Sequence, residues 1–160
     1  MPSSVDDLPV RPGPRPTTTP TNPHTQLDQI APVNLQLEIA EFMFALSCVD
    51  EGPSQISVPG ARAMLLQDSC LAGPPEAFMI DREFCHIHPP SDGSLHLNLP
   101  PEVGPVAIEK GWAENHPMAR LGIIPTTVVM VYGPRDRTEV DVVKFLVAAS
   151  HRFAHPAPTG

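Results

Sequence analysis

The sequence lacks the features that several classes of protein require. It contains no run of five or more Lys or Arg residues, and its formal net charge is −8. Nucleic acids and anionic membrane surfaces attract basic patches, so we expect neither as a partner. No apolar run approaches the roughly 18 to 20 residues that cross a bilayer. The chain is therefore expected to be a soluble protein that does not span a membrane.

Cysteine is also scarce. The three cysteines, Cys48, Cys70 and Cys85, are odd in number and show no C-x-x-C spacing. This pattern predicts no disulfide framework and a reducing, cytoplasmic location. Residues 1–16 lack the charged and then apolar pattern of a secretory signal, which favours the same location. A glycine-rich phosphate loop, a G-x-S-x-G elbow and an H-E-x-x-H motif are absent too, so no common catalytic signature assigns the chain.

Proline, in contrast, is abundant, with 22 residues. Many of them gather in residues 1–24, where they remove backbone donors and exclude helix. We predict a proline-rich arm over 1–24 that is disordered or extended. An ordered, extended path of residues 15–29 across the domain is the alternative. Residues 25–155 are predicted to form a single domain and residues 156–160 a tail.

The remaining pattern predicts an α+β fold. Helices are expected from the apolar periodicity over 33–46, 100–110 and 137–153. Strand-like stretches are expected over 55–66, 77–80 and 126–132, with loops over 50–54 and 111–117. Together with a central hairpin, these elements favour a small, mostly antiparallel sheet with helices packed on one face. The other face of the sheet is then free for a pocket.

The central hairpin spans residues 84–99, with Asp92-Gly93 as its turn signal. Strand side chains alternate between faces, so Cys85 and Ile87 are predicted to pack with the leucines of the second strand. Phe84 shares the opposite face with two histidines in this pattern. That polar face carries the residues of the candidate site, which are His86, His88, Ser94, His96 and Asn98.

Three interpretations of His86, His88 and His96 are open. As acid/base groups they could take a proton from an enol or hydroxyl near neutral pH, and we prefer this catalytic role. As metal ligands they would offer an H-x-H pair and a third imidazole. No Glu or Asp lies on the same predicted face, so a metal is not the preferred interpretation. The third interpretation is three surface or half-buried histidines without a ligand.

Further substrate-binding residues are predicted around the hairpin. Ser94 and Asn98 share its polar face. Trp112 and His116 lie in a loop of the kind that lines pockets, although Trp112 could equally plug the core. Arg135 could hold an acidic group of a substrate, whereas its neighbour Asp136 is most simply a helix cap.

Four short motifs together resemble the luciferase-domain family. They are His86-Ile87-His88-Pro89, then Asp92-Gly93-Ser94-Leu95-His96-Leu97, then Gly111-Trp112-Ala113-Glu114-Asn115-His116-Pro117, and Tyr132-Gly133-Pro134-Arg135-Asp136. The resemblance covers roughly residues 55–153. It implies an enzyme-like pocket for a small enolic or aromatic molecule, with molecular oxygen as co-substrate and no organic cofactor, as in the oxidation of a hydroxypyrone by fungal luciferases.

The resemblance thus favours a cofactor-independent oxidative enzyme. Light emission is not expected, because residues 1–16 show no hydrophobic anchor of the kind fungal luciferases are thought to carry. A non-catalytic module that binds a small molecule or a protein through its arm is the first alternative. A histidine-ligated metalloprotein is the second. The sequence gives no prediction of oligomeric state.

Overall fold

The computed structural model describes residues 1–157, and within them six strands form one sheet. The strand order is β1-β2-β3-β4-β6-β5, and every neighbouring pair is antiparallel. In chain order the elements are η1 (Val5–Asp7), α1 (Val33–Ala45), β1 (Val49–Pro53), β2 (Arg62–Leu66), η2 (Pro75–Ala77), β3 (Glu83–Ile87), β4 (Leu95–Asn98), α2 (Gly104–Glu109), β5 (Ala113–Asn115), α3 (Pro117–Arg120), β6 (Val128–Val131) and α4 (Arg137–Ala154). The predicted α+β class with an antiparallel sheet is confirmed.

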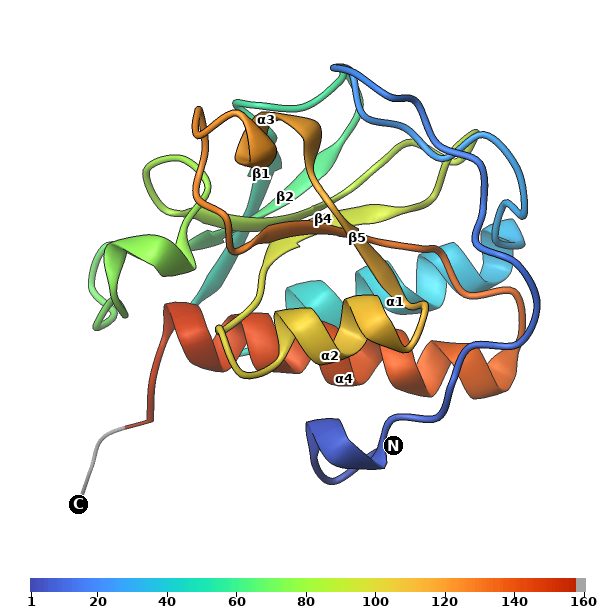
Figure 1. The fold of residues 1–160 in the computed structure, drawn as a ribbon. Coiled ribbons are helices and arrows are strands. Elements are labelled where there is room, and N and C mark those ends of the chain that lie inside the picture. The colour runs from blue at the N-terminus through green and yellow to red at the C-terminus, as the bar shows by residue number, and fades with distance from the viewer. Residues whose placement is uncertain (158–160) are drawn as a thin grey trace.

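Helices α1, α2 and α4 lie on one face of the sheet, as Figure 1 shows. Helix α4 begins where Asp136 accepts a hydrogen bond from the backbone N–H of Glu139, 3.0 Å away, as an N-terminal cap does. Its buried valines, such as Val143, pack with Leu95 and Leu97 of β4 in the main core. The core therefore occupies the helical side, and the opposite face of the sheet is left for other contacts.

Two edge strands were not expected from the sequence. β1 (Val49–Pro53) is largely exposed, and all of it except Val49 falls in the predicted loop over 50–54. β5 (Ala113–Asn115) lies in the predicted loop before His116 and is only three residues long. Such polar or very short edge strands carry no alternating apolar pattern, because one of their sides faces solvent.

A β-bulge in β3 changes which side chains reach each face. Met64 of β2 pairs with Cys85, but Leu65 pairs with Glu83, so Phe84 has no partner in the ladder. The prediction that Phe84 shares a face with the histidines is wrong. Phe84 is fully buried in the helical-side core, and Glu83 instead lies on the face of His86. An inserted residue of this kind reverses the alternation at one position.

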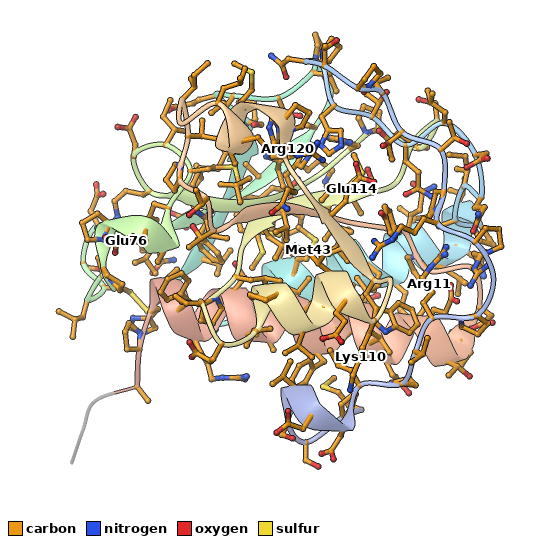
Figure 2. All side chains as sticks on the ribbon, viewed as in Figure 1. Arg11, Met43, Glu76, Lys110, Glu114 and Arg120 are labelled. Atoms are coloured by element: carbon orange, nitrogen blue, oxygen red, sulfur yellow. A yellow bond between two sulfur atoms is a disulfide. The ribbon has the colours of Figure 1, made fainter. Side chains whose placement is uncertain are left out.

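The N-terminal arm runs along one edge of the domain and over the face of the sheet opposite the helices (Figure 1). Figure 2 shows Arg11 and Lys110 where the arm passes the α2 side of the molecule. The backbone N–H of Arg11 donates to the carbonyl of Lys110 at 2.8 Å, and the indole N–H of Trp112 donates to the carbonyl of Pro9 at 2.6 Å. The arm then folds back on itself, where Thr18 and Gln26 pair in an isolated antiparallel β-bridge.

Cys48 and Cys70 form a disulfide, which corrects the prediction of no disulfide framework. The two cysteines are 22 positions apart, and only the packing of the α1–β1 connection against the loop after β2 brings them together. Cys85 is free and buried. None of the helices formed by residues 1–157 is long and apolar enough to cross a membrane. Residues 158–160 of the predicted tail lie outside the described residues.

Candidate functional site

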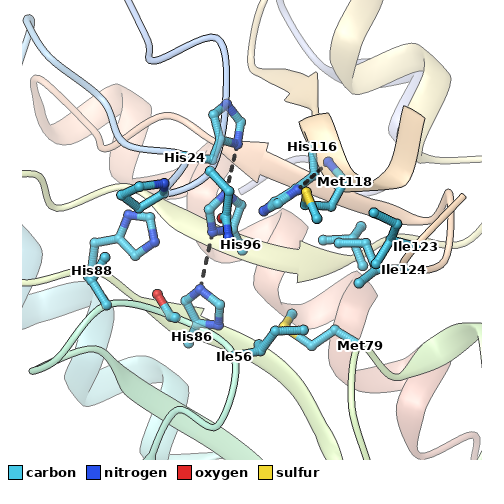
Figure 3. Close-up of a pocket in the computed structure, with 15 residues that line it drawn as sticks. His24, Ile56, Met79, His86, His88, His96, His116, Met118, Ile123 and Ile124 are labelled. Carbon is cyan, nitrogen blue, oxygen red and sulfur yellow. Dashed lines mark hydrogen bonds between the residues drawn. The ribbon is translucent and has the colours of Figure 1, made fainter. Parts of the chain in front are cut away.

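A cavity of about 240 Å³ lies on the sheet face opposite the main helices. Most of its wall is apolar, and its polar part is a group of histidines (Figure 3). We call these five side chains the histidine cluster: His24, His86, His88, His96 and His116. The remaining lining residues are Asn22, Pro23, Ile56, Ser57, Val58, Met79, Met118, Ile123, Ile124 and Val128.

Three members of the cluster come from the hairpin. His86 and His96 are direct partners across β3 and β4, and Nε2 of His86 lies 3.1 Å from Nδ1 of His96. His88 follows the end of β3 on the same side, with its ring centroid 4.7 Å from that of His96. The structure therefore brings together the three histidines that the alternation pattern placed on one face.

His24 and His116 complete the cluster from outside the hairpin. The arm carries His24 over the sheet, where its Nδ1 lies 2.9 Å from Nε2 of His96. His116 caps α3, and its Nδ1 accepts a hydrogen bond from the backbone N–H of Met118 at 3.0 Å. In the neutral ring of His116 the proton therefore lies on Nε2.

Three of the five histidines also bond to a carboxylate. Glu83 lies 2.8 Å from Nδ1 of His86, Asp92 lies 2.7 Å from Nδ1 of His88, and Glu114 lies 2.8 Å from Nε2 of His24. The expectation that no Glu or Asp shares the histidine face is wrong. The bulge brings Glu83 to that face, the hairpin turn folds Asp92 back beneath His88, and β5 supplies Glu114.

The turn that positions Asp92 depends on a glycine. Gly93 has a φ of 71°, a backbone region that residues with a Cβ rarely adopt. A Cβ at this position would also lie 2.5 Å from the amide group of Gln36. Only glycine therefore lets the turn place both carboxylate oxygens of Asp92, one near His88 and one accepting from the N–H of Ser94 at 3.0 Å.

Burial keeps several of these groups in defined protonation states. Desolvation lowers the pKa of His86, although its hydrogen bond to Glu83 opposes the shift. Desolvation and the neighbouring histidines lower the pKa of His96 well below its usual value. For His116, desolvation and the nearby histidines lower the pKa to about 4. These three rings are therefore neutral at pH 7.

The carboxylate of Asp92 shows two opposing effects. Desolvation acts to raise its pKa, but hydrogen bonds from His88 and Ser94 outweigh it, so the net shift is downward. At Glu114, hydrogen bonds from His24, Tyr132 and Thr18 outweigh desolvation in the same way and lower the pKa. Both groups are ionised at pH 7 and accept hydrogen bonds from imidazole N–H groups.

Two predicted substrate-binding residues on the hairpin do not line the cavity. Ser94 is fully buried and donates its hydroxyl proton to Asp92 at 2.5 Å, so its hydroxyl supports the carboxylate of the His88 pair. Asn98 is buried beyond the cavity, and its amide N–H donates to the carbonyl of Glu76 and to the hydroxyl of Thr127, both at 3.1 Å. Alternation places both residues on the correct face. The hydroxyl of Ser94 and the amide N–H of Asn98 bond to protein, whereas Oδ1 of Asn98 is buried without a hydrogen-bond partner among the described residues.

Trp112 and Arg135 lie elsewhere in the fold. Trp112 is 2% exposed within the helical-side core, and the arm accepts its indole proton. Arg135 bonds to Glu139 of α4 at 2.5 Å and to the carbonyl of Pro12 at 2.8 Å, and so fastens the arm to the helix. Of the five residues predicted to bind substrate, only His116 lines the cavity.

Two sets of three histidines within the described residues have ring nitrogens close enough to share a metal ion. One set is His86, His88 and His96, and the other is His24, His96 and His116. In each set the candidate nitrogen atoms lie within 4.8 Å of one another. His24 was not among the site residues predicted from the sequence, because it lies in the arm. Its only signal was the varied polar composition of residues 21–29.

Comparisons with known proteins agree with the motifs. Residues 81–150 match the family model described as the luciferase domain. The chain is 30% identical to a luciferase of Armillaria mellea over 171 aligned positions, 98% of this chain and 64% of that protein. It is 37% identical to a luciferase of Neonothopanus nambi over 49% of this chain and 30% of that protein. The chain therefore spans less than two thirds of these relatives. No solved structure is significantly similar to it.

Proposed function

We propose that this chain, which is homologous to the luciferase-domain family over residues 81–150, binds a small enolic or aromatic molecule in its cavity and promotes the oxidation of that molecule by oxygen. The observation that carries the proposal is the division of the cavity wall. Its polar atoms converge in the histidine cluster, and most of the other lining residues are aliphatic side chains, methionines and a proline. A flat, largely apolar molecule with one acidic hydroxyl matches such a wall.

The two ring nitrogens that face the cavity from His88 and His116 have different roles. His88 lines the cavity and its Nδ1 bonds to Asp92, so in the neutral ring Nε2 carries the lone pair. Nδ1 of His116 accepts from Met118, so its Nε2 carries a proton. One wall of the cavity thus offers an acceptor for the enol proton and another offers a donor to the resulting oxygen anion.

The chemistry follows from that pair of nitrogens. The enol O–H bond breaks, its proton leaves the substrate, and the electron pair remains as an enolate that the N–H of His116 stabilises. An enolate carbon is electron-rich enough to reduce molecular oxygen, and a new C–O bond forms as a peroxide. The peroxide oxygen then takes back the proton. In the cofactor-independent form predicted from the sequence, Nε2 of His88 holds the proton between these steps.

The non-catalytic alternative predicts the same binding without oxygen consumption. In that case the cavity would hold its ligand unchanged. Contact with a partner protein through the arm is less favoured, because the arm already packs against Trp112 and carries His24 into the cavity. The cytoplasmic location predicted from the sequence stays a prediction. It was based partly on the absence of predicted disulfides, and the disulfide between Cys48 and Cys70 weakens that reason.

Oxygen uptake in the presence of simple probes tests the proposal. We would measure oxygen consumption with a hydroxypyrone and with a catechol, using the full chain and His88→Gln. We expect uptake above the rate without protein, and a decrease of at least about 100-fold in His88→Gln, the size of a lost acid/base group. The matched control is His151→Gln on α4, whose Nε2 bonds to the carbonyl of Ser47 far from the cavity.

Two results would contradict the proposal. Binding of a probe, seen as a rise in melting temperature, without any oxygen uptake would identify a binding module. Equal uptake by the wild type and by His88→Gln would show that His88 does not accept the enol proton.

A further inference from the structure

We propose that His86, His88 and His96 bind a divalent first-row transition-metal ion at the wall of the cavity. The inference depends on the geometry of the histidine cluster and would change one step of the proposed oxidation, the acceptance of the enol proton by His88. Metal binding is tested without substrate, so either proposal can fail alone. Neutral imidazole is a preferred ligand of zinc, iron, cobalt, nickel and copper ions. Three such ligands with the cavity beside them resemble the open sites of catalytic metals, which keep a position for water or substrate.

The spacing of the nitrogens suits one ion. Nε2 of His86 lies 3.1 Å from Nδ1 of His96. Two nitrogens bound at about 2.05 Å are separated by about 2.9 Å at a right angle and by about 3.3 Å at a tetrahedral angle. His88 offers a third ring nitrogen within 4.8 Å of nitrogens of His86 and His96, and among the described residues no group hydrogen-bonds to its Nε2. The side chain of His88 is only 1% exposed, and it lines the cavity.

The partners of the outer nitrogens are those of a metal site. Glu83 accepts from Nδ1 of His86, and Asp92 accepts from Nδ1 of His88. A carboxylate on the far nitrogen fixes the tautomer of a ligand histidine, aims its lone pair and makes the ring more basic. Glu83 is in turn held by the hydroxyl of Ser54 at 2.7 Å and the backbone N–H of Gln55 at 3.0 Å. Both rings therefore present an unprotonated Nε2 to the same space.

Counting protons supports a cation between His86 and His96. These two rings and His24 form a chain of four close contacts from the carboxylate of Glu83 to that of Glu114, at 2.8, 3.1, 2.9 and 2.8 Å. Each contact needs one proton, but three neutral imidazoles supply only three. A fourth proton or a metal cation must fill the remaining contact, and the carboxylates of Glu83 and Glu114 at the two ends balance its charge.

A metal ion can fill the contact that lacks a proton. When it takes the place of the missing proton between Nε2 of His86 and Nδ1 of His96, every other contact has a donor. His86 donates to Glu83, His96 donates through Nε2 to His24, and His24 donates to Glu114. All three rings are then neutral.

The same reasoning excludes the other set of histidines. In His24, His96 and His116 the third ligand would be Nε2 of His116. That atom carries the proton of the neutral ring, because Nδ1 accepts from the backbone N–H of Met118. A bound ion would have to displace either that proton or the helix cap. His116 is thus a hydrogen-bond donor beside the metal site and not a ligand.

The ion would alter the acid/base step. It would occupy Nε2 of His88, so that ring would no longer accept the enol proton. A cation beside the cavity lowers the pKa of a hydroxyl or water that binds it, and so favours the same enolate. His116 keeps its role as donor to that oxygen. The expected substrate class is then a molecule whose acidic hydroxyl can bind a metal.

Titration of the metal-free chain with Zn²⁺ and Co²⁺ tests the inference without any substrate. After chelator treatment, we expect one ion per chain by calorimetry and by elemental analysis. His86→Gln, His88→Gln and His96→Gln should each weaken binding at least about 100-fold. Glu83→Gln and Asp92→Asn should weaken it about 10- to 100-fold, the range measured for outer partners of metal ligands. His116→Gln is the matched control from the same cavity and should bind within about 2-fold of the wild type.

Three outcomes would overturn the inference. They are no stoichiometric binding of either ion, equal binding by His96→Gln and the wild type, or loss of binding in His116→Gln as large as in His96→Gln. Where a variant does not fold, the visible absorption spectrum of Co²⁺ with the wild-type chain decides. A strong band of low-coordinate cobalt supports the site, and the weak spectrum of hydrated cobalt contradicts it. Oxygen uptake is measured separately, so a chain that binds metal and consumes no oxygen overturns only the proposed function.

Discussion

Oε2 of Glu83 lies 2.8 Å from Nδ1 of His86, although strict alternation would put residues three positions apart on opposite faces of a strand. The bulge at Phe84 makes the contact possible. It exchanges a phenyl ring for a carboxylate on the histidine face. The bulge therefore provides the charge that fixes the tautomer of His86.

Glu83→Ala is expected to destabilise the fold by about 3 kcal/mol. The substitution leaves the hydroxyl of Ser54, the N–H of Gln55 and Nδ1 of His86 without their acceptor, and each such loss costs about 1–3 kcal/mol before water enters. Denaturant unfolding measures the change. The matched control is Glu51→Ala, which breaks a half-exposed ion pair with Arg62 and should cost less than about 1 kcal/mol. Equal effects would show that the buried carboxylate adds no more stability than a half-exposed ion pair.

Deleting residues 1–16 is expected to expose Trp112. The deletion removes the carbonyl of Pro9, which accepts the indole proton, and Leu8, which is 3% exposed. Losing the burial of one leucine costs about 2 kcal/mol, so the melting temperature should fall. Trp112 is the only tryptophan, and its fluorescence maximum should move to longer wavelength. An unchanged maximum would mean that the arm does not cover the indole in solution.

The ion pairs of Glu38 should make stability depend on acidity. Hydrogen bonds from Arg137 and Lys144 lower the pKa of Glu38 to about 2. A carboxylate with a lowered pKa in the folded state stabilises the fold fully above its ordinary value of 4.5, and this stabilisation is lost as the pH falls toward 2. In Glu38→Gln the melting temperature should therefore change less between pH 4.5 and 2 than in the wild type. Glu41→Gln, an exposed residue of the same helix, should keep the wild-type slope.

Reduction of the disulfide should lower stability by about 3 kcal/mol, the amount expected when a cross-link closes a loop of about this length. The cross-linked residues, Cys48 and Cys70, are 22 positions apart. A thiol reagent should find no reactive group in the native oxidised chain and two after reduction. Cys85 should react only after denaturation, because burial raises the pKa of its thiol. One reactive thiol in the oxidised native chain would contradict this assignment.

Local patterns were sufficient to predict the hairpin part of the site. Alternation placed His86 and His96 on one face, and the register of β3 and β4 makes them direct partners. The apolar partners Cys85 and Leu97 lie opposite each other on the core side, as predicted. Periodicity also gave α1 and α4 to within a residue at each end. These features depend on neighbours in sequence, which the sequence shows directly.

The rest of the site depends on contacts that no local pattern shows. His24 reaches the cavity only because the arm is fastened at Pro9, Pro12 and Thr18. Glu83 reaches it through a bulge, and bulges have no strong sequence signal. The metal interpretation was not preferred because the alternation pattern placed none of the three carboxylates, Glu83, Asp92 and Glu114, on the histidine face. Ser94 and Asn98 were placed on the correct face, but a face does not say whether a polar group meets a ligand or a protein partner.

The contacts within the histidine cluster close loops of very different length, so they differ in the conformational entropy that their formation costs. His86 and His96 are 10 positions apart, whereas His24 and His96 are 72 positions apart. Closing the longer loop costs about 1.8 kcal/mol more by ideal-chain scaling. We therefore expect the hairpin pair to form before His24 docks onto it. Native-state hydrogen exchange should accordingly show that the arm around His24 opens at a lower free energy than the β3–β4 ladder does.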